Sequence, residues 1–145
     1  MKCIEKTLYE ALPIGQLLRM PAGLLGVESC QQVRLTTRPE EAPFLWLEWV
    51  GGSKTTLLVM PPSILFPTYQ PEIGSNDMKC LGVNTSADAW VLNLVTLYQD
   101  GRASINLQGP IVINRKTLVA RQVVPVNVLH FNLHHPLPVI RDAGG

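Results

Sequence analysis

Apolar and polar residues alternate in short runs along most of the chain. In residues 31–37, Val33 and Leu35 fall on one face while Arg34 and Thr36 fall on the other, as in a half-buried strand. The 12 prolines and 11 glycines are spread over the whole length, which favours many short strands over long helices. Strands are therefore expected at residues 15–20, 31–37, 44–50, 55–60, 89–98, 103–108, 111–113 and 117–124.

Turn signals join neighbouring runs into antiparallel hairpins. The Gly-Gly-Ser-Lys sequence at 51–54 predicts one hairpin. The Asp-Gly pair inside residues 99–102 predicts a second hairpin with a type I′ turn, because that turn requires positive φ. Gly109 and Pro110 should interrupt the strand ladder, since proline lacks an N–H donor and glycine permits a bulge.

One short helix is expected near the middle of the chain. Residues 76–81 suit a helical turn, with Ser75 or Asn76 capping its start and Gly82 ending it. The remaining short strands would leave few exposed edges in a sandwich or a small closed barrel. We therefore predict an all-β protein: a small antiparallel β-barrel-like domain with at most one or two short helical turns.

The length of 145 residues suits one domain. We place that domain at residues 15–137, after an N-terminal extension at 1–14 and before a flexible C-terminal tail at 138–145. Hydrophobic residues make up 46% of the chain, which is enough for a core. The 12 basic and 11 acidic residues are well mixed and give a net charge of +1, which argues against a dedicated binder of nucleic acids or membrane surfaces.

Features of targeting and redox chemistry point to the cytoplasm. The N-terminal segment carries Glu5 and Glu10 and lacks a long apolar run, so no signal peptide is expected. No window approaches the roughly 18 apolar residues of a membrane-spanning helix. Cys3, Cys30 and Cys80 are odd in number and far apart, which predicts reduced thiols rather than a disulfide framework.

The side chains that could carry catalysis or metal binding are poorly arranged for it. His130, His134 and His135 could suggest a metal site, but the flanking prolines oppose a helix that would align them, and solvated histidines are the simpler interpretation. Glu40 and Glu41 are adjacent in an evident loop, where a solvated turn is the better reading. No nucleophile motif is present. We expect no enzymatic activity, no cofactor and no metal.

The three tryptophans leave several binding functions open. Trp46 and Trp49 flank Glu48 and fall on opposite faces of one strand, so one is expected in the core and the other on an exposed patch that suits a protein partner. A barrel that binds single-stranded nucleic acid would surround such platforms with basic residues. The alternatives are a nucleic-acid-binding barrel and a small-ligand-binding module with a deep cavity lined by Trp90 and His130.

The stretch INLQGPIVIN at residues 105–114, followed by RQVV at 121–124, resembles the FliW family of flagellar assembly factors. Members of that family typically read Ala-Asn-Leu-x-Ala-Pro-Ile-Val-Ile-Asn at the first block. Further similarities follow in order at residues 23–27, 42–47, 62–73 and 135–137, so that the resemblance spans about 15–137. The departures are Leu25 and Val27 for Pro and Phe, Thr68 for an acid, Gly109 for alanine, and a nearly neutral net charge where members are usually acidic.

The resemblance implies a regulator that acts by binding other proteins. FliW proteins are small cytoplasmic β-barrel-like domains that bind the translational regulator CsrA, antagonise its repression of flagellin synthesis, and also bind flagellin. The resemblance therefore implies a CsrA-type regulator and flagellin as alternating partners of a monomeric protein, without direct contact to nucleic acid or membrane. Because a nearly neutral body repels RNA little, steric or allosteric antagonism is expected to dominate here.

Two groups of residues are the predicted contacts for such partners. Phe66 and Tyr69 lie on a proline-bounded loop and are the candidate apolar anchors. The polar residues around the broken ladder either expose a docking edge or satisfy backbone groups at the bend. The predicted partner-binding residues are Phe66, Tyr69, Asn106, Gln108, Pro110 and Asn114.

Overall fold

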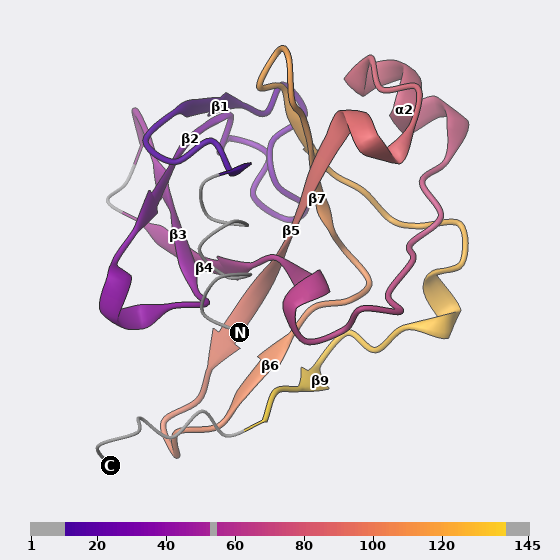
Figure 1. Ribbon diagram of the computed structural model, residues 1–145. Helices are drawn as coiled ribbons and strands as arrows, with labels where there is room; N and C mark the ends of the chain where they lie inside the picture. Colours follow the sequence, from indigo (N-terminus) through magenta and orange to yellow (C-terminus); the bar gives the residue numbers. More distant parts are fainter. Residues whose placement is uncertain (1–10, 53–54, 139–145) are drawn as a thin grey trace.

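The computed structural model describes residues 11–52 and 55–138 (Figure 1). Within them lie one α-helix, α2 (Ser75–Leu81), and four single-turn 3₁₀ helices, η1 (Pro39–Glu41), η2 (Pro62–Ile64), η3 (Ser86–Asp88) and η4 (Val128–His130). The strands are β1 (Leu17–Arg19), β2 (Gln32–Thr37), β3 (Leu45–Trp49), β4 (Thr56–Met60), β5 (Ala89–Leu97), β6 (Ala103–Ile105), β7 (Ile111–Asn114), β8 (Ala120–Gln122) and β9 (His135–Pro136).

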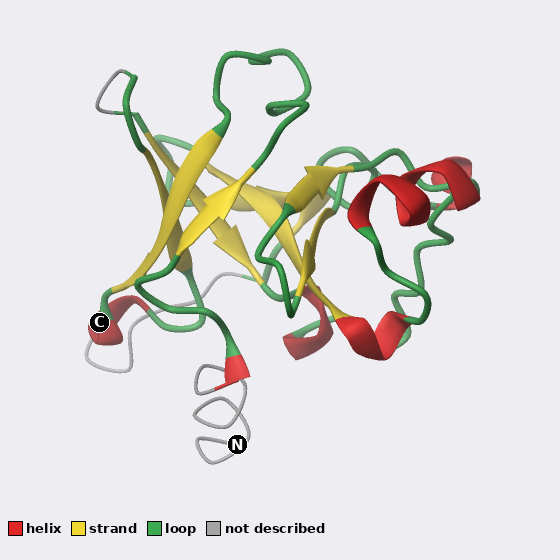
Figure 2. Cartoon of the chain, turned by 90° about the horizontal axis from the view of Figure 1, so that it is seen from above, coloured by secondary structure: helices red, strands yellow, loops and turns green. Residues whose placement is uncertain are grey.

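The strands form one antiparallel sheet that curls toward a barrel. Its main path runs β1-β2-β3-β4-β5-β6-β9, and β5 also pairs with β7, which pairs with β8. Strand β1 meets the chain just before β8 at one isolated parallel bridge between Arg19 and Val119, where the Arg19 N–H donates to the Leu118 carbonyl at 3.1 Å. Figure 2 shows the strands crossing one another in the middle of the molecule, with the helical turns at its periphery. The predicted all-β, barrel-like class with little helix is confirmed.

Strand β5 is the central element, because it contributes to two parts of the sheet. Its first half pairs with β7 and its second half with β6, while β4 lies along its other edge. The chain between β6 and β7, residues 106–110, leaves the ladder and returns to it. The predicted interruption at Gly109 and Pro110 is therefore confirmed, and both residues are buried in it.

The main core lies inside the curled sheet, and the alternation in the sequence builds it. Val33 and Leu35 of β2 and Leu45 and Leu47 of β3 are all fully buried, as their spacing predicts. Burying each such side chain contributes about 1.5–3 kcal/mol before the entropy of ordering is counted. A separate cluster lies beneath α2 and joins that helix to the outer face of β7, through Leu81, Val83, Val112 and Val123.

The predictions made from the sequence for α2 were partly correct. The helix spans Ser75–Leu81 and ends at Gly82, which takes the left-handed conformation at φ 71°. Its N-cap is Gly74, however, and neither Ser75 nor Asn76 caps it. Because Gly74 provides no side-chain acceptor, the helix start gains no capping bond, and contacts with other elements must hold the helix in place.

The hairpin at residues 99–102 forms, but its predicted turn type is wrong. A type I′ turn requires positive φ at two residues, and Leu118 is the only non-glycine with positive φ in the described parts of the chain. Gly101 alone takes φ 88° here, and its N–H donates to the Tyr98 carbonyl at 3.0 Å. The Asp100 carboxylate accepts the Arg102 backbone N–H at 3.0 Å, which stabilises a longer loop with one left-handed residue.

The predicted domain limits can be compared with the structure only in part. Of the expected extension, residues 1–10 lie outside the described residues, while Leu12 is buried in the main core and Ile14 packs against it. Of the expected tail, only residue 138 is described. No helix in the described ranges is long and apolar enough to cross a membrane.

Candidate partner-binding groove

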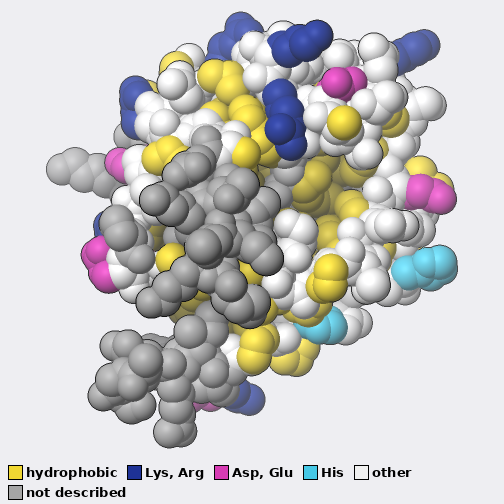
Figure 3. Space-filling view, viewed as in Figure 1, with side chains coloured by type: hydrophobic (Ala, Val, Ile, Leu, Met, Phe, Trp, Pro, Cys, Tyr) yellow, Lys and Arg dark blue, Asp and Glu magenta, His cyan; other side chains and the backbone are white. Residues whose placement is uncertain are grey.

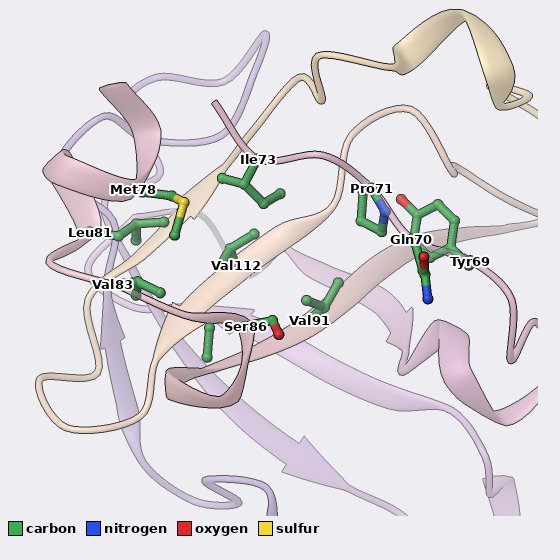
Figure 4. Close-up of a pocket in the computed structure, with 11 residues that line it drawn as sticks. Tyr69, Gln70, Pro71, Ile73, Met78, Leu81, Val83, Ser86, Val91 and Val112 are labelled. Atoms are coloured by element: carbon green, nitrogen blue, oxygen red, sulfur yellow. The ribbon is translucent and has the colours of Figure 1, made fainter. Parts of the chain in front are cut away.

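A hollow of about 430 Å³ opens between α2, the loop before it, and the outer face of the sheet (Figure 4). We call this hollow the groove. Its size falls within the range of about 300–1,000 Å³ that binding pockets commonly have. Its walls are mostly apolar: Met78 and Leu81 from α2, Ala89 and Val91 from β5, Val112 from β7, and Ile73 from the preceding loop. Figure 3 shows the same region as an apolar recess, with Lys and Arg side chains along the top of that face.

The groove exists because β5 is apolar on both faces. Leu92 points into the main core and is fully buried, whereas Ala89 and Val91 point outward and are only half-buried. Outward apolar residues on a strand need a covering element. Helix α2 covers part of this face through Leu81, while Met78 remains half-buried at the wall of the groove. The uncovered remainder is an apolar surface that a partner side chain can enter.

Two polar anchors fix α2 beside the groove. The buried Asn114 amide donates from Nδ2 to the Leu81 carbonyl at 2.7 Å, at the end of the helix. Near the start of the helix, Arg121 Nε donates to the Asp77 carboxylate at 2.8 Å, and both side chains are partly shielded from solvent. The groove wall is therefore held from β7 and β8 by side chains rather than by a strong N-cap.

Tyr69 lies where the loop before α2 reaches the groove, and contacts at its hydroxyl and at its ring hold the side chain in place. Its hydroxyl donates to the Leu107 carbonyl at 2.7 Å and accepts from Asn93 Nδ2 at 3.3 Å. Its ring packs edge-on against Phe131, with centroids 4.8 Å apart. Burial raises the pKa of Tyr69 to about 12, against a smaller opposing effect of the Asn93 hydrogen bond. The predicted anchor therefore lines the groove as a rigid wall, and its contact with a partner stays a prediction.

Phe66 does not line the groove, but it packs in the same hydrophobic cluster as Tyr69. Its ring meets that of His135 edge-on, with centroids 4.9 Å apart. Phe66 remains half-buried there and packs against Leu58 and Met60 among other residues. The two predicted anchors thus share one hydrophobic cluster, but only Tyr69 lines the groove.

The predicted polar contacts mostly bond to the backbone. Asn106 Oδ1 accepts the Gln108 N–H at 2.9 Å, and Gln108 Nε2 donates to the Phe131 carbonyl at 2.9 Å. Asn114 Oδ1 accepts the Lys116 N–H at 2.8 Å, in addition to the bond to Leu81. These bonds are the backbone-satisfying alternative that the sequence left open. A role of Asn106, Gln108, Pro110 and Asn114 in partner binding stays a prediction.

A second, smaller hollow of about 260 Å³ adjoins the groove. We call it the side pocket. The two hollows share the wall residues Tyr69, Pro71, Ala89 and Val91. The side pocket is lined further along by Pro62, Trp90 and Arg115, so that the two hollows form one trough along the start of β5.

The other sites considered from the sequence were a metal site, a cavity lined by Trp90 and His130, and a pair of catalytic carboxylates, and the described residues give little support to them. No cluster of three or more His, Cys, Asp or Glu side chains suited to a metal occurs in residues 11–52 and 55–138. His130 is exposed on η4 and does not line the side pocket with Trp90. Glu41 accepts the Trp46 indole N–H at 2.8 Å, which is a structural contact. Burial raises the pKa of the Cys30 thiol, while Cys80 is exposed, and both are free.

Sequence reasoning missed most of the groove, including Ile73, Met78, Val91 and Val112. One usable signal was the uninterrupted apolar start of β5, because a strand that is apolar on both faces must be covered on both. The sequence could not show that α2 would cover this face only in part.

Comparison with known proteins gives the family. The model of the family described as FliW protein matches residues 4–137. The chain belongs to the FliW family. A relative from Leptospira interrogans, named flagellar assembly factor FliW, is 32% identical over 117 residues, which cover 79% of this chain and 78% of that protein. The protein of the same name from Bacillus subtilis is 25% identical over 123 residues, covering 84% and 85%.

The fold agrees with that of a solved FliW structure. A crystal structure of the flagellar assembly factor FliW superposes with a TM-score of 0.73 at 24% identity, covering 88% of this chain and 87% of the other. This similarity supports the fold. The family match begins at residue 4, within the segment that the sequence analysis treats as an N-terminal extension.

Proposed function

We propose that this FliW-family chain is a flagellar assembly factor that binds a CsrA-type translational regulator and flagellin in turn, and so relieves repression of flagellin synthesis. The observation that carries the proposal is the family match over residues 4–137. The names of the relatives as flagellar assembly factors support it.

The groove supplies a physical basis for this activity. A partner-switching regulator needs a rigid scaffold and an apolar surface that partners can cover, and it needs no nucleophile or metal. If both partners cover the groove, each displaces the other by mass action. Because the net charge is +1, antagonism of the regulator is expected to be steric or allosteric rather than electrostatic.

A competition titration with the CsrA-type regulator and flagellin of the same organism tests the proposal. We expect each partner to bind at micromolar concentration or tighter, and added flagellin to displace the labelled regulator in full. If neither protein forms a complex with the chain, the proposal is wrong. Simultaneous binding of both without displacement would overturn the switching part.

Groove variants test where the partners bind. Met78→Glu and Ile73→Glu each place a charge on the apolar wall, and both are expected to weaken binding of both partners at least tenfold. Leu97→Glu is the matched control, because Leu97 is 59% exposed at the far end of β5 and does not line the groove. Circular dichroism checks that all three variants are folded. Unchanged binding by both groove variants would place the interface elsewhere.

A further inference from the structure

The acidic side chains nearest the groove are engaged within the protein or face away from it. Asp77 on α2 is paired with Arg121 at 2.8 Å. The Asp88 carboxylate accepts from the Thr85 backbone N–H at 3.3 Å and from its hydroxyl at 3.2 Å. Glu72 is exposed between two wall residues, but it does not line the groove or the side pocket. The trough therefore carries no acidic wall residue within the described chain.

The cation that lines the trough, Arg115, has by contrast no acidic partner among the described residues, and neither do two lysines near it in sequence. Lys79 on α2 and Arg115 and Lys116 after β7 are exposed and form no salt bridge with any described residue. Arg115 lies at the rim itself, because its Nε is 3.5 Å from the carbonyl oxygen of Ala89, which lines both hollows. Among the described residues that line the trough, Arg115 is thus the only charged one, although the whole chain is nearly neutral.

Two residues that line the side pocket carry hydrogen-bond donors. The guanidinium of Arg115 stacks over the Trp90 ring at 5.0 Å, and both residues line this pocket. The Trp90 Nε1 is buried and has no hydrogen-bond partner in the described structure. A buried donor without an acceptor is unusual in a folded protein. The adjoining guanidinium offers a planar fork of donors suited to a carboxylate.

We propose that the trough binds an acidic amphipathic segment of a partner protein, with bulky apolar side chains in the groove and a carboxylate at Arg115 in the side pocket. This inference rests on the proposal that the groove binds partner proteins, and it names the chemistry of the segment they present. Apolar walls set next to the unpaired Arg115 match such a segment, whereas a basic segment would meet Arg115 with like charge.

Selection from a phage-displayed library of random dodecapeptides tests this chemistry without assuming any partner. Peptides are selected on the wild-type protein and depleted on Met78→Glu, so that the survivors depend on the groove. We expect them to combine apolar residues with Asp or Glu, and to bind Arg115→Gln more weakly. Survivors that are basic or without enriched acids would overturn the inference, as would failure to obtain any groove-dependent peptide.

A pair of arginine variants tests the carboxylate contact on the selected peptides and on the two proposed partners. Arg115→Gln removes the cation and is expected to weaken binding about 10- to 100-fold, with most of the salt dependence lost. Arg115→Lys keeps the charge without the fork and should fall between the two. The matched control is Arg38→Gln. Arg38 likewise stacks over an indole, with its guanidinium 4.9 Å from the centre of the Trp46 ring, but it does not line the trough.

The outcomes separate the two proposals. If the regulator and flagellin bind, and lose affinity in Met78→Glu but not in Arg115→Gln, the inference is wrong and the proposed function stands. If neither protein binds the wild type, the proposed function fails, and the peptide selection alone decides the inference. A second copy of the chain is the rival occupant: a wild-type dimer that Val91→Glu converts to a monomer in sedimentation would overturn the inference.

Discussion

Asn114 offers the sharpest test of how the groove is held, because its one amide joins α2 to the turn after β7. Its side chain is 6% exposed. Nδ2 donates to the Leu81 carbonyl at 2.7 Å, while Oδ1 accepts the N–H groups of Lys116 at 2.8 Å and Thr117 at 3.2 Å. Asn114→Ala removes these three bonds, together with a longer one from Nδ2 to the Gly82 carbonyl at 3.4 Å, and leaves the Leu81 carbonyl without its side-chain donor at a buried position.

The expected cost follows from these bonds. Each hydrogen bond contributes about 1 kcal/mol net, and a buried group left unsatisfied costs about 1–3 kcal/mol. The N–H groups of Lys116 and Thr117 can form hydrogen bonds to water instead. We therefore expect a total loss of about 3 kcal/mol in the free energy of unfolding. Urea unfolding, followed by tryptophan fluorescence and by circular dichroism, measures this loss as a lower midpoint at an unchanged slope.

Two further variants separate the mechanism from a general loss of stability. Asn127→Ala removes a comparable amide that accepts the Glu72 N–H at 2.8 Å in a solvent-accessible setting, and it should cost about 1 kcal/mol or less. Asn114→Asp keeps the acceptor oxygens but sets a carboxylate against the Leu81 carbonyl. It should be as damaging as alanine at neutral pH and recover as the carboxyl is protonated. A cost for Asn114→Ala no larger than that of Asn127→Ala would refute this account of the helix anchor.

Other positions give equally direct tests. Tyr69→Phe deletes the bond to the Leu107 carbonyl and should cost about 1 kcal/mol in thermal unfolding. Because burial raises the pKa of Tyr69 to about 12, the unfolded chain ionises first; the wild type should lose stability relative to Tyr69→Phe as pH rises from about 10 to about 12, and a constant difference would contradict this. Gly23→Ala should cost more than about 2 kcal/mol, because Gly23 has φ 70° and a Cβ there would overlap the Glu28 backbone. Gly26→Ala has a similar φ of 86° with open space, and should cost about 1 kcal/mol; equal costs would show that the loop yields.

The parts of the fold that sequence could predict are those that local rules govern. The alternation in β2 and β3 fixes which side chains enter the core, and a register shift by one residue would expose Val33 and Leu35 together. Gly82 ends α2 as expected, because it takes the left-handed conformation. The prediction of a type I′ turn was wrong because the Asp100 carboxylate accepts a hydrogen bond from the Arg102 backbone N–H. The Asp-Gly pair alone does not reveal this competing local bond.

The candidate site could be predicted much less well, since it depends on long-range packing. Met78, Val91 and Val112 come from three elements and meet only because α2 lies across the outer face of β5 and β7. No local pattern indicates how much of that face the helix covers. The motif in residues 105–114 did identify the family, yet its amides mostly serve the scaffold, and the groove walls lie largely outside it.

The interrupted strand explains why amide side chains occur in such an apolar stretch. Where β5 loses its ladder partner, Asn93 Nδ2 donates to the Asn106 carbonyl at 2.8 Å, and Gln122 Nε2 donates to the Gly109 carbonyl at 3.1 Å. These side chains replace missing backbone bonds at buried positions, a requirement that holds whether or not a partner is bound. The Asn106 side chain acts in the same way, because its Oδ1 accepts the Gln108 N–H at 2.9 Å, so Asn106→Ala should lower the unfolding midpoint and leave the affinity of the folded fraction unchanged. Weaker partner binding at an unchanged midpoint would instead establish Asn106 as a contact residue, and the interrupted strand as part of the interface.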